Sequence, residues 1–421
     1  MTMLSKLTLP YLAMDQASFA ADPWPEFETA RSRHPWLAKC AFGFVVTQYD
    51  AMKDLLLMDD NLKGAYEDIV DVMEARGTSW GRFQLESVLN ASGAAHRRIR
   101  DVLALAFTPR FVIKYRPVMR QVMIDLLKEW VPKKRFDFEE FASYFPVGVI
   151  CSMLGAPRSA LPSLRSSMET FGLSVSMKKE LLPKLVEAMD TLDAFSQDLV
   201  AKRRKARLPK GEEDLLEYLI AANDSGGLTE RELYDMLIFL FVAGYDTSKN
   251  AMTIMMNIMI DRPDDYRHCA EDLLFSRKVV EETFRYQTTA TIPRVVTKDI
   301  AYRDVTIPKG TVLFFPVSVS GRDPAIPNST TFDPTREHTV RHIAFGRGAH
   351  MCLGQHIART QIEEGFHLIA QTMKNPRRTG AAVCPPSGRW PPGRWPPSHP
   401  PGGPCSAGWP TRPRPALAGC W

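Results

Sequence analysis

The feature that most constrains the fold is one long, capped and strongly apolar helical stretch that begins at Thr229. Thr229 and Glu232 form a capping box, in which a hydroxyl and a carboxylate each satisfy a backbone N–H at the helix start. The helical pattern continues to Arg262-Pro263, where proline ends it. About 33 residues at roughly 1.5 Å each give a rod of roughly 50 Å. Such a helix is expected to run through the middle of a large domain.

The rest of the body has a mainly helical pattern with short strands near both ends. We predict helices over 95–107, 116–131, 181–207, 212–223, 278–286 and 353–373, and strands over 42–49, 294–296 and 311–315. Residues 321–337 are rich in Pro, Asp and Asn and are expected to form a meandering loop. Because no linker divides residues 1–375, we predict one large domain there.

Composition indicates a cytoplasmic globular protein without a membrane span, because its longest apolar run, residues 236–244, is too short for one. The N-terminus lacks a proper signal-peptide pattern. Among the cysteines of the body, Cys40, Cys151, Cys269 and Cys352 have no paired spacing, which suits reduced thiols. Before residue 374, 46 Lys and Arg face all 48 acidic residues. Nucleic-acid binding needs a basic face, and this balance gives no sign of one.

The composition changes abruptly in residues 376–421. The final 41 residues hold 12 of the 32 prolines and four of the eight tryptophans, so we expect this tail to be disordered or loosely packed, without an interior strand. It could be a Pro-rich partner-binding segment. We favour translation out of frame through GC-rich DNA, which the nucleotide sequence can test.

The densest chemical signal is the stretch 345–354, in which a cysteine lies in a glycine-punctuated loop directly before a helix. Backbone N–H groups at the helix start are expected to stabilise a Cys352 thiolate and lower its pKa. Gly348 and Gly354 let the backbone turn and approach a flat partner. Two other interpretations remain open: a buried structural cysteine, or a zinc site with His350 and His356, although the four ligands that zinc needs are not all nearby.

This stretch, Phe345-x-x-Gly348-x-His350-x-Cys352-x-Gly354, resembles the heme-binding signature of the cytochrome P-450 family in its soluble bacterial form. Further family motifs follow the right order over roughly residues 20–373. They are His96-x-x-x-Arg100, Ala243-Gly244-Tyr245-Asp246-Thr247, Glu282-x-x-Arg285, Arg294 after Ile292-Pro293, and Phe332-Asp333-Pro334-Thr335-Arg336. Glu-x-x-Arg alone carries little information, whereas the ordered set is highly specific.

The resemblance implies a mainly α, triangular single domain with small β-sheets, which holds heme b (iron protoporphyrin IX) between the central helix and the helix after the cysteine loop. It implies that Cys352 is the single protein ligand of the iron, where a thiolate pushes electron density onto the metal and favours O–O cleavage. His96, Arg100, Arg294 and His350 are expected to meet the heme propionates. The other expected cofactor contacts are Ala243, Gly244, Phe345, Gly346 and Gly354.

The resemblance also assigns roles on the central helix and in the later loop. Thr247 is expected beside the oxygen-binding site, where its hydroxyl can bond the carbonyl four residues back and loosen the helix locally. Asp246 is expected to help deliver protons. Glu282, Arg285 and Arg336 are expected to form a buried charge triad that specifies the fold.

Substrate and partners are less visible in the sequence. Residues expected to line the pocket are apolar, which implies a hydrophobic substrate; they are Phe239, Val242, Ala243, Ala290 and Ile292. Electrons are expected from a ferredoxin and ferredoxin reductase, docking on a basic face of Arg97, Arg98, Arg347 and Arg359. We predict a monomeric monooxygenase. The alternatives are a heme-binding protein with turnover impaired by its altered ending, and an isomerase or dehydratase on the same fold.

Overall fold

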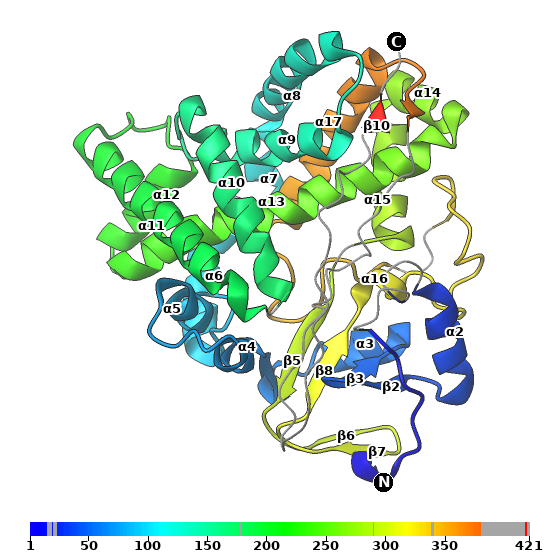
Figure 1. Ribbon diagram of the computed structural model, residues 1–421. Coiled ribbons are helices and arrows are strands. Elements are labelled where there is room, and N and C mark those ends of the chain that lie inside the picture. The colour runs from blue at the N-terminus through cyan, green and yellow to red at the C-terminus, as the bar shows by residue number, and fades with distance from the viewer. Residues whose placement is uncertain are drawn as a thin grey trace.

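The computed structural model describes residues 1–14, 19, 23–176, 178–288, 290–337, 341–379 and 417–418. This part of the protein is mainly α-helical with small β-sheets, which confirms the predicted fold class. In Figure 1 most helices lie in the upper part of the view and the strands of the largest sheet lie below them. Every helix in the described ranges is too short or too polar to span a membrane.

The predicted central helix is present as α13, Glu230–Ile260, and its capping box is confirmed. The Thr229 hydroxyl accepts the Glu232 N–H at 3.2 Å, and the Thr229 N–H donates to the Glu232 carboxylate at 2.8 Å. Helices from distant parts of the chain pack along it, among them α9 (Phe138–Met153), α11 (Leu182–Lys205) and α17 (Gln355–Thr372). The helix therefore crosses the helical part of the domain, as its apolar length predicts (Figure 1).

The other predicted helices are present with small shifts at their ends. They are α6 (Gly93–Ala104), α8 (Arg116–Trp130), α12 (Leu215–Asp224) and α15 (Leu273–Tyr286). The two largest shifts have a local cause. Asp214 caps α12 by accepting the Glu217 N–H at 2.9 Å, and Asp272 caps α15 by accepting the Leu274 N–H at 2.8 Å. An aspartate at the N-cap fixes a helix start more sharply than the apolar pattern does.

Shorter helices complete this architecture. They are α2 (Trp24–Arg33), α3 (Tyr49–Leu55), α4 (Tyr66–Val72), α5 (Ser79–Glu86), α7 (Pro109–Ile113), α10 (Leu161–Phe171), α14 (Pro263–Glu271) and α16 (Val317–Ser320).

The largest sheet has five strands in the order β2-β3-β8-β5-β4. Their bounds are β2 Leu37–Cys40, β3 Gly43–Val46, β8 Val312–Phe315, β5 Ile292–Val296 and β4 Leu62–Gly64. The strand predicted over 42–49 is shorter than expected because α3 begins at Tyr49. A smaller sheet joins β1 (Thr2–Met3), β7 (Val305–Ile307) and β6 (Ile300–Tyr302). Across β4 and β5, Gly64 lies opposite Arg294, which places one predicted site residue on this sheet.

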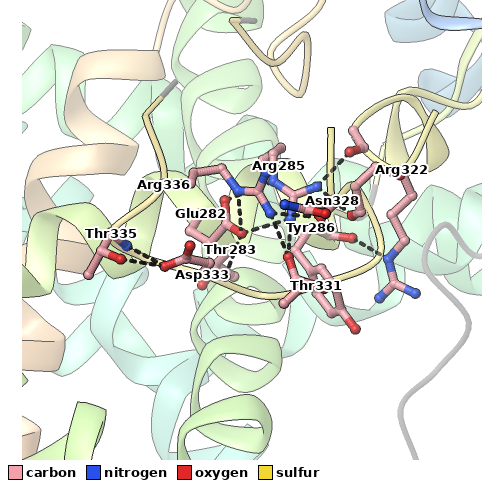
Figure 2. Close-up of polar contacts among 12 residues, drawn as sticks. Glu282, Thr283, Arg285, Tyr286, Arg322, Asn328, Thr331, Asp333, Thr335 and Arg336 are labelled. Carbon is pink, nitrogen blue, oxygen red and sulfur yellow. Dashed lines mark hydrogen bonds and ion pairs between the residues drawn. The ribbon is translucent and has the colours of Figure 1, made fainter. Parts of the chain in front are cut away.

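The predicted charge triad is confirmed and is buried (Figure 2). Arg285 donates to both carboxylate oxygens of Glu282, at 2.8 Å from Nε and 2.7 Å from Nη2. Arg336 Nε lies 3.1 Å from Glu282 Oε1. The side chains of Glu282, Arg285 and Arg336 are 0%, 2% and 11% exposed. A desolvated charge set of this kind is stable only when all partners are present.

The two arginines of the triad also hold the loop 321–337, which contains no helix or strand, as predicted. Arg285 donates to the carbonyls of Gly321, Ser329 and Thr331 at 2.6–2.9 Å. Arg336 donates to the carbonyls of Pro327, Asn328 and Thr331 at 2.8–2.9 Å. Guanidinium groups thus satisfy backbone oxygens that a helix or sheet would otherwise pair (Figure 2).

Most of the tail lies outside the described residues, so the predictions of disorder and of out-of-frame translation remain predictions. Four residues of the tail are in strands, but both strands are edge strands of a two-stranded sheet, so the expectation that the tail has no interior strand stays a prediction. Arg377–Arg378 form β9, which pairs with β10, Leu417–Ala418, in a two-residue antiparallel ladder. The ladder needs only two residues from each strand, so it does not conflict with the proline-rich sequence between the two strands.

Candidate active site

The loop before Cys352 has a backbone conformation that strongly favours glycine at two positions. Gly346 and Gly348 have φ angles of 71° and 73°, in the left-handed region. A Cβ atom on Gly348 would lie 2.6 Å from the Leu56 carbonyl oxygen and 2.7 Å from Asp59 Oδ2. Asp59 also accepts the N–H of the next residue, Ala349, at 2.8 Å. Glycine at 348 therefore lets the loop close against the segment 56–59.

Cys352 follows this turn, and its N–H donates to the Phe345 carbonyl at 2.8 Å. Its side chain is solvent-accessible, yet burial raises the pKa of the thiol, against the opposing effects of the Gly354 N–H and the charges of Arg100 and Arg359. The prediction that the helix start gives a net lowering of this pKa is therefore wrong, because desolvation outweighs the N–H bond. Cys352 thus keeps an accessible side chain although much protein surrounds its sulfur.

Four basic side chains from three segments lie around this position. His96 and Arg100 come from α6, Arg294 from β5, and His350 from the cysteine loop. The His96 and His350 rings are 3.9 Å apart between centroids, and Arg100 Nη2 donates to the Met351 carbonyl at 2.7 Å. The structure thus brings together side chains that the sequence separates by more than two hundred positions.

The basic cluster (His96, Arg100, Arg294 and His350) contains two guanidinium groups, and the charge of Asp59 acts on Arg294 and His96. Burial lowers the pKa of Arg294 and of Arg100. Burial and the charges of Arg294, His96 and Arg100 together lower the pKa of His350 to about 3. Neither arginine forms an ion pair with a carboxylate of the described residues. Since buried guanidinium groups are normally paired, the cluster fits an anionic ligand.

Tyr66, at the start of α4, belongs beside this cluster, and sequence reasoning missed it. Its ring packs over Gly64, where a Cβ atom would lie 2.7 Å from the ring. Burial raises the pKa of the Tyr66 hydroxyl, while the nearby charge of Arg294 lowers it. A tyrosine two residues after a short strand is an ordinary core residue in sequence, so no signal distinguished it.

The middle of α13 presents an accessible surface where a central helix would normally be covered. Ala243 and Thr247 are exposed, and a Cβ atom on Gly244 would meet nothing within 4 Å. The Thr247 hydroxyl donates to the Ala243 carbonyl at 3.0 Å, as expected. The expected local loosening is not seen, because α13 continues as one helix through these residues. The opening therefore arises from small side chains rather than from a break in the helix.

Asp246 has a partner that the sequence analysis did not identify. Lys249, whose side chain is 2% exposed, lies 3.0 Å from Asp246 Oδ1 and 3.0 Å from Glu139 Oε1 on α9. The i,i+3 spacing of Asp246 and Lys249 on one helix is a readable signal for an ion pair. The contribution of Glu139 depends on the packing of α9 against α13, and spacing could not indicate it.

The predicted basic docking face is only partly available. Arg98 forms an ion pair with Glu232, and Arg359 lies 2.6 Å from Glu281. Within the described ranges, Arg97 and Arg347 form no ion pair. The residues predicted to line the substrate pocket are half-buried or exposed, and this role stays a prediction; they are Phe239, Val242, Ala243, Ala290 and Ile292.

The polar groups gathered at this site suit a flat, dianionic cofactor with a metal that binds sulfur. It offers one accessible thiol, two guanidinium groups without a carboxylate partner among the described residues, two tilted imidazoles with ring centroids 3.9 Å apart, and the glycines of the cysteine loop. Elsewhere in the described residues, no three His, Cys, Asp or Glu side chains are grouped as metal ligands would be.

Comparison with known proteins agrees with this geometry. Residues 43–375 match the family model described as cytochrome P-450. The chain belongs to the cytochrome P-450 family. It is 30% identical over 378 residues to a luteothin monooxygenase of Streptomyces thioluteus, covering 88% of this chain and 91% of the relative. It is 27% identical over 371 residues to a biotin-biosynthesis cytochrome P-450 of Bacillus subtilis strain 168, covering 85% and 90%.

Solved structures give the same fold. A complex of P450BioI with an acyl carrier protein that bears hexadec-9Z-enoic acid superposes with a TM-score of 0.75 at 24% identity, covering 85% of this chain and 93% of that chain. Epothilone D-bound P450epoK superposes with a TM-score of 0.79 at 20% identity, covering 89% and 96%. The protein is thus a cytochrome P-450 monooxygenase, and its family implies a heme cofactor.

Proposed function

We propose that this cytochrome P-450 binds heme b through Cys352 and inserts one oxygen atom from O₂ into a hydrophobic small molecule. Electrons would come from a ferredoxin-type donor. The observation that carries this proposal is the accessible Cys352 side chain, which follows the left-handed backbone turns at Gly346 and Gly348.

The basic cluster supports a role in holding the cofactor carboxylates. Arg100 and Arg294 supply guanidinium groups without carboxylate partners among the described residues, and His96 and His350 supply ring nitrogens. Tyr66 adds a hydroxyl near Arg294. Charge-assisted hydrogen bonds to these groups are stronger than neutral ones. When bound, heme supplies the metal that takes up O₂ and the electrons.

On the opposite side, α13 supplies polar groups for proton transfer. The Thr247 hydroxyl donates a hydrogen bond to the Ala243 carbonyl. Its oxygen lone pairs are therefore left to accept a hydrogen bond from a group bound beside α13. Lys249 Nζ lies 3.0 Å from Asp246 Oδ1, so the Asp246 side chain is paired with a cation of the same helix. A rotation of Asp246 away from Lys249 would bring a carboxylate to water that reaches Thr247.

The substrate side is apolar, which supports a hydrophobic substrate. Phe239 and Val242 lie on the accessible side of α13, and Ile292 lies on β5 next to Gly346, whose Cβ position it approaches within 3.2 Å. Because these side chains are apolar, shape rather than charge would select the substrate.

Arg97 and Arg347 support a docking site for an acidic electron donor, because neither guanidinium is neutralised by a described carboxylate. Replacing either by glutamate should raise the KM for a ferredoxin several-fold at low salt, and less at high salt. The R98E variant serves as the matched control, since Arg98 is already paired with Glu232.

The experiment that tests the function is turnover with isotopically labelled O₂, a generic ferredoxin and its reductase, against a library of hydrophobic compounds. The proposal predicts a product that carries one labelled oxygen atom, and pigment extracted as heme b. T247A should consume the reductant while forming less product, since Thr247 serves proton delivery. Heme binding without any oxygenated product would favour the alternative of impaired turnover.

A further inference from the structure

Arg359 occupies a fixed position one turn into α17. Its side chain is 17% exposed, and its Nε lies 2.6 Å from Glu281 Oε1 on α15. The guanidinium carbon lies 4.3 Å from the centroid of the Phe345 ring. Its Nη1 also donates to the Gln355 side-chain oxygen at 3.1 Å. A guanidinium with an ion pair, a stacked ring and a hydrogen bond has little freedom to leave this place.

Glu281 is itself held by a second contact. Its other oxygen, Oε2, lies 3.1 Å from His342 Nε2, and His342 Nδ1 accepts the Ala344 N–H at 3.3 Å. One carboxylate therefore joins α15, the chain just before the cysteine loop, and α17. The adjacent Glu282 serves the buried triad on the same helix, so neighbouring glutamates anchor two different loops.

Phe345 connects this arrangement to the sulfur ligand position. Its ring packs edge-on against Phe284 at 4.8 Å between centroids, and its carbonyl accepts the Cys352 N–H at 2.8 Å. The guanidinium of Arg359 thus lies against the residue that fixes the start of Cys352.

We propose that Arg359 is a positioning residue for electron transfer: Glu281 and Phe345 hold its charge beside Cys352, where it reduces the electron density that the thiolate gives to iron. The inference rests on the proposed role of Cys352 as the heme ligand. Uptake of an electron adds negative charge at the site, and a fixed cation favours the reduced state. Arg359 therefore raises the reduction potential and eases the first electron from a donor.

This role differs from the docking role that the sequence suggested for Arg359. A docking arginine must meet the partner's carboxylates at the surface, whereas this one is mostly buried and already paired with Glu281. Its effect should therefore persist without any electron donor, in an equilibrium measurement on the isolated holoenzyme.

The test is a spectroelectrochemical titration of the heme-loaded protein with R359Q, R359M and R359K. The matched control is R120Q. Arg120, on α8, pairs with Glu364 of α17, the helix that carries Arg359, but Arg120 does not stack on Phe345. We expect the neutral variants to lower the equilibrium constant for reduction about tenfold, which corresponds to about 59 mV for one electron. The CO stretching frequency of the ferrous adduct should fall in the same variants. R359K and R120Q should remain near the wild type.

Two neutral variants guard against a folding failure of either one. A wild-type potential in a neutral variant that keeps the thiolate-type ferrous–CO band overturns this inference and leaves Cys352 as the ligand. An equal shift in R359K and R359Q also overturns it, because geometry rather than charge would then be responsible. Failure of both neutral variants to incorporate heme while R359K does so would assign Arg359 to cofactor binding and likewise overturn it. Absence of the band in the wild type would instead refute the proposed function.

Discussion

Replacing Glu282 with glutamine removes the one negative charge of the buried triad while keeping the shape of the side chain. In the native protein its Oε1 accepts from Arg285, Arg336 and the Asp333 N–H, at 2.7, 3.1 and 2.8 Å. Its Oε2 accepts from Arg285 Nε at 2.8 Å. In E282Q one of these oxygens becomes an NH₂ group, which faces a donor instead of accepting from it.

The size of the effect follows from burial. Arg285 is 2% exposed, so its charge cannot be rehydrated when the carboxylate is lost. Removing one partner of a buried ion pair costs about 3–5 kcal/mol. Three carbonyls of the loop 321–337 still accept from Arg285, which places the expected loss toward the lower end, at about 3 kcal/mol.

The assay is urea unfolding of the heme-loaded protein, followed by far-ultraviolet circular dichroism and by the Soret band. E67Q is the matched control, because Glu67 pairs with Lys63 where both side chains are well exposed, at 49% and 35%. Such a surface pair contributes about 0–1 kcal/mol. If E282Q and E67Q lower the free energy of unfolding equally, by less than about 1 kcal/mol, the reasoning from burial is refuted.

Three further predictions concern the site. G348A should lose heme during purification and unfold more easily by about 1–3 kcal/mol, because its φ of 73° is strained for alanine and Leu56 blocks the Cβ; a fully loaded, equally stable variant would contradict this. R294Q should release heme to apomyoglobin roughly 10- to 100-fold faster, as expected for losing a charge-assisted hydrogen bond of about 1.5–3 kcal/mol; an unchanged rate would contradict it. Burial alone would raise the pKa of Glu281, but the His342 hydrogen bond and the Arg359 charge lower it to about 2 from 4.5. The ionised carboxylate of Glu281 therefore stabilises the folded state by up to roughly 3 kcal/mol above about pH 4.5, and this stabilisation is lost as the pH falls toward about 2. In E281Q the free energy of unfolding should depend less on pH in that window.

The sequence was informative where structure depends on local patterns or on compact motifs. The capping box at Thr229 and the continuous apolar pattern predicted α13 to within a few residues. The resemblance of the Glu282-x-x-Arg285 motif and of the later motif with Arg336 to those of the family predicted the buried triad. The glycines around Cys352 predicted a turn whose backbone conformation strongly favours glycine. Each of these features is determined by a few residues close together or by a highly specific arrangement.

Features that depend on tertiary packing were missed or predicted wrongly. α9 contains Pro146 in its interior, which by local rules should end a helix. Nearly all of α9 is buried against α8 and α13, and this burial outweighs the roughly 3 kcal/mol that an interior proline costs.

Electrostatic surroundings were equally inaccessible to sequence reasoning. The direction of the pKa shift of Cys352 depends on how much protein surrounds the sulfur, which no motif reports. The partners of Arg98 and Arg359 come from distant helices, so a docking face of four arginines was reduced to two. The pairing of Lys249 with Asp246 was readable from spacing, but Glu139 was not.

The central claim is that the sulfur of Cys352 is the protein ligand of the heme iron. The most direct measurement is the ferrous–CO difference spectrum of the wild type, C352S and the control C151A, which alters a cysteine buried within α9. The account predicts the long-wavelength Soret band of a thiolate adduct in the wild type and in C151A, and its loss in C352S. An unchanged band in purified C352S would contradict the account.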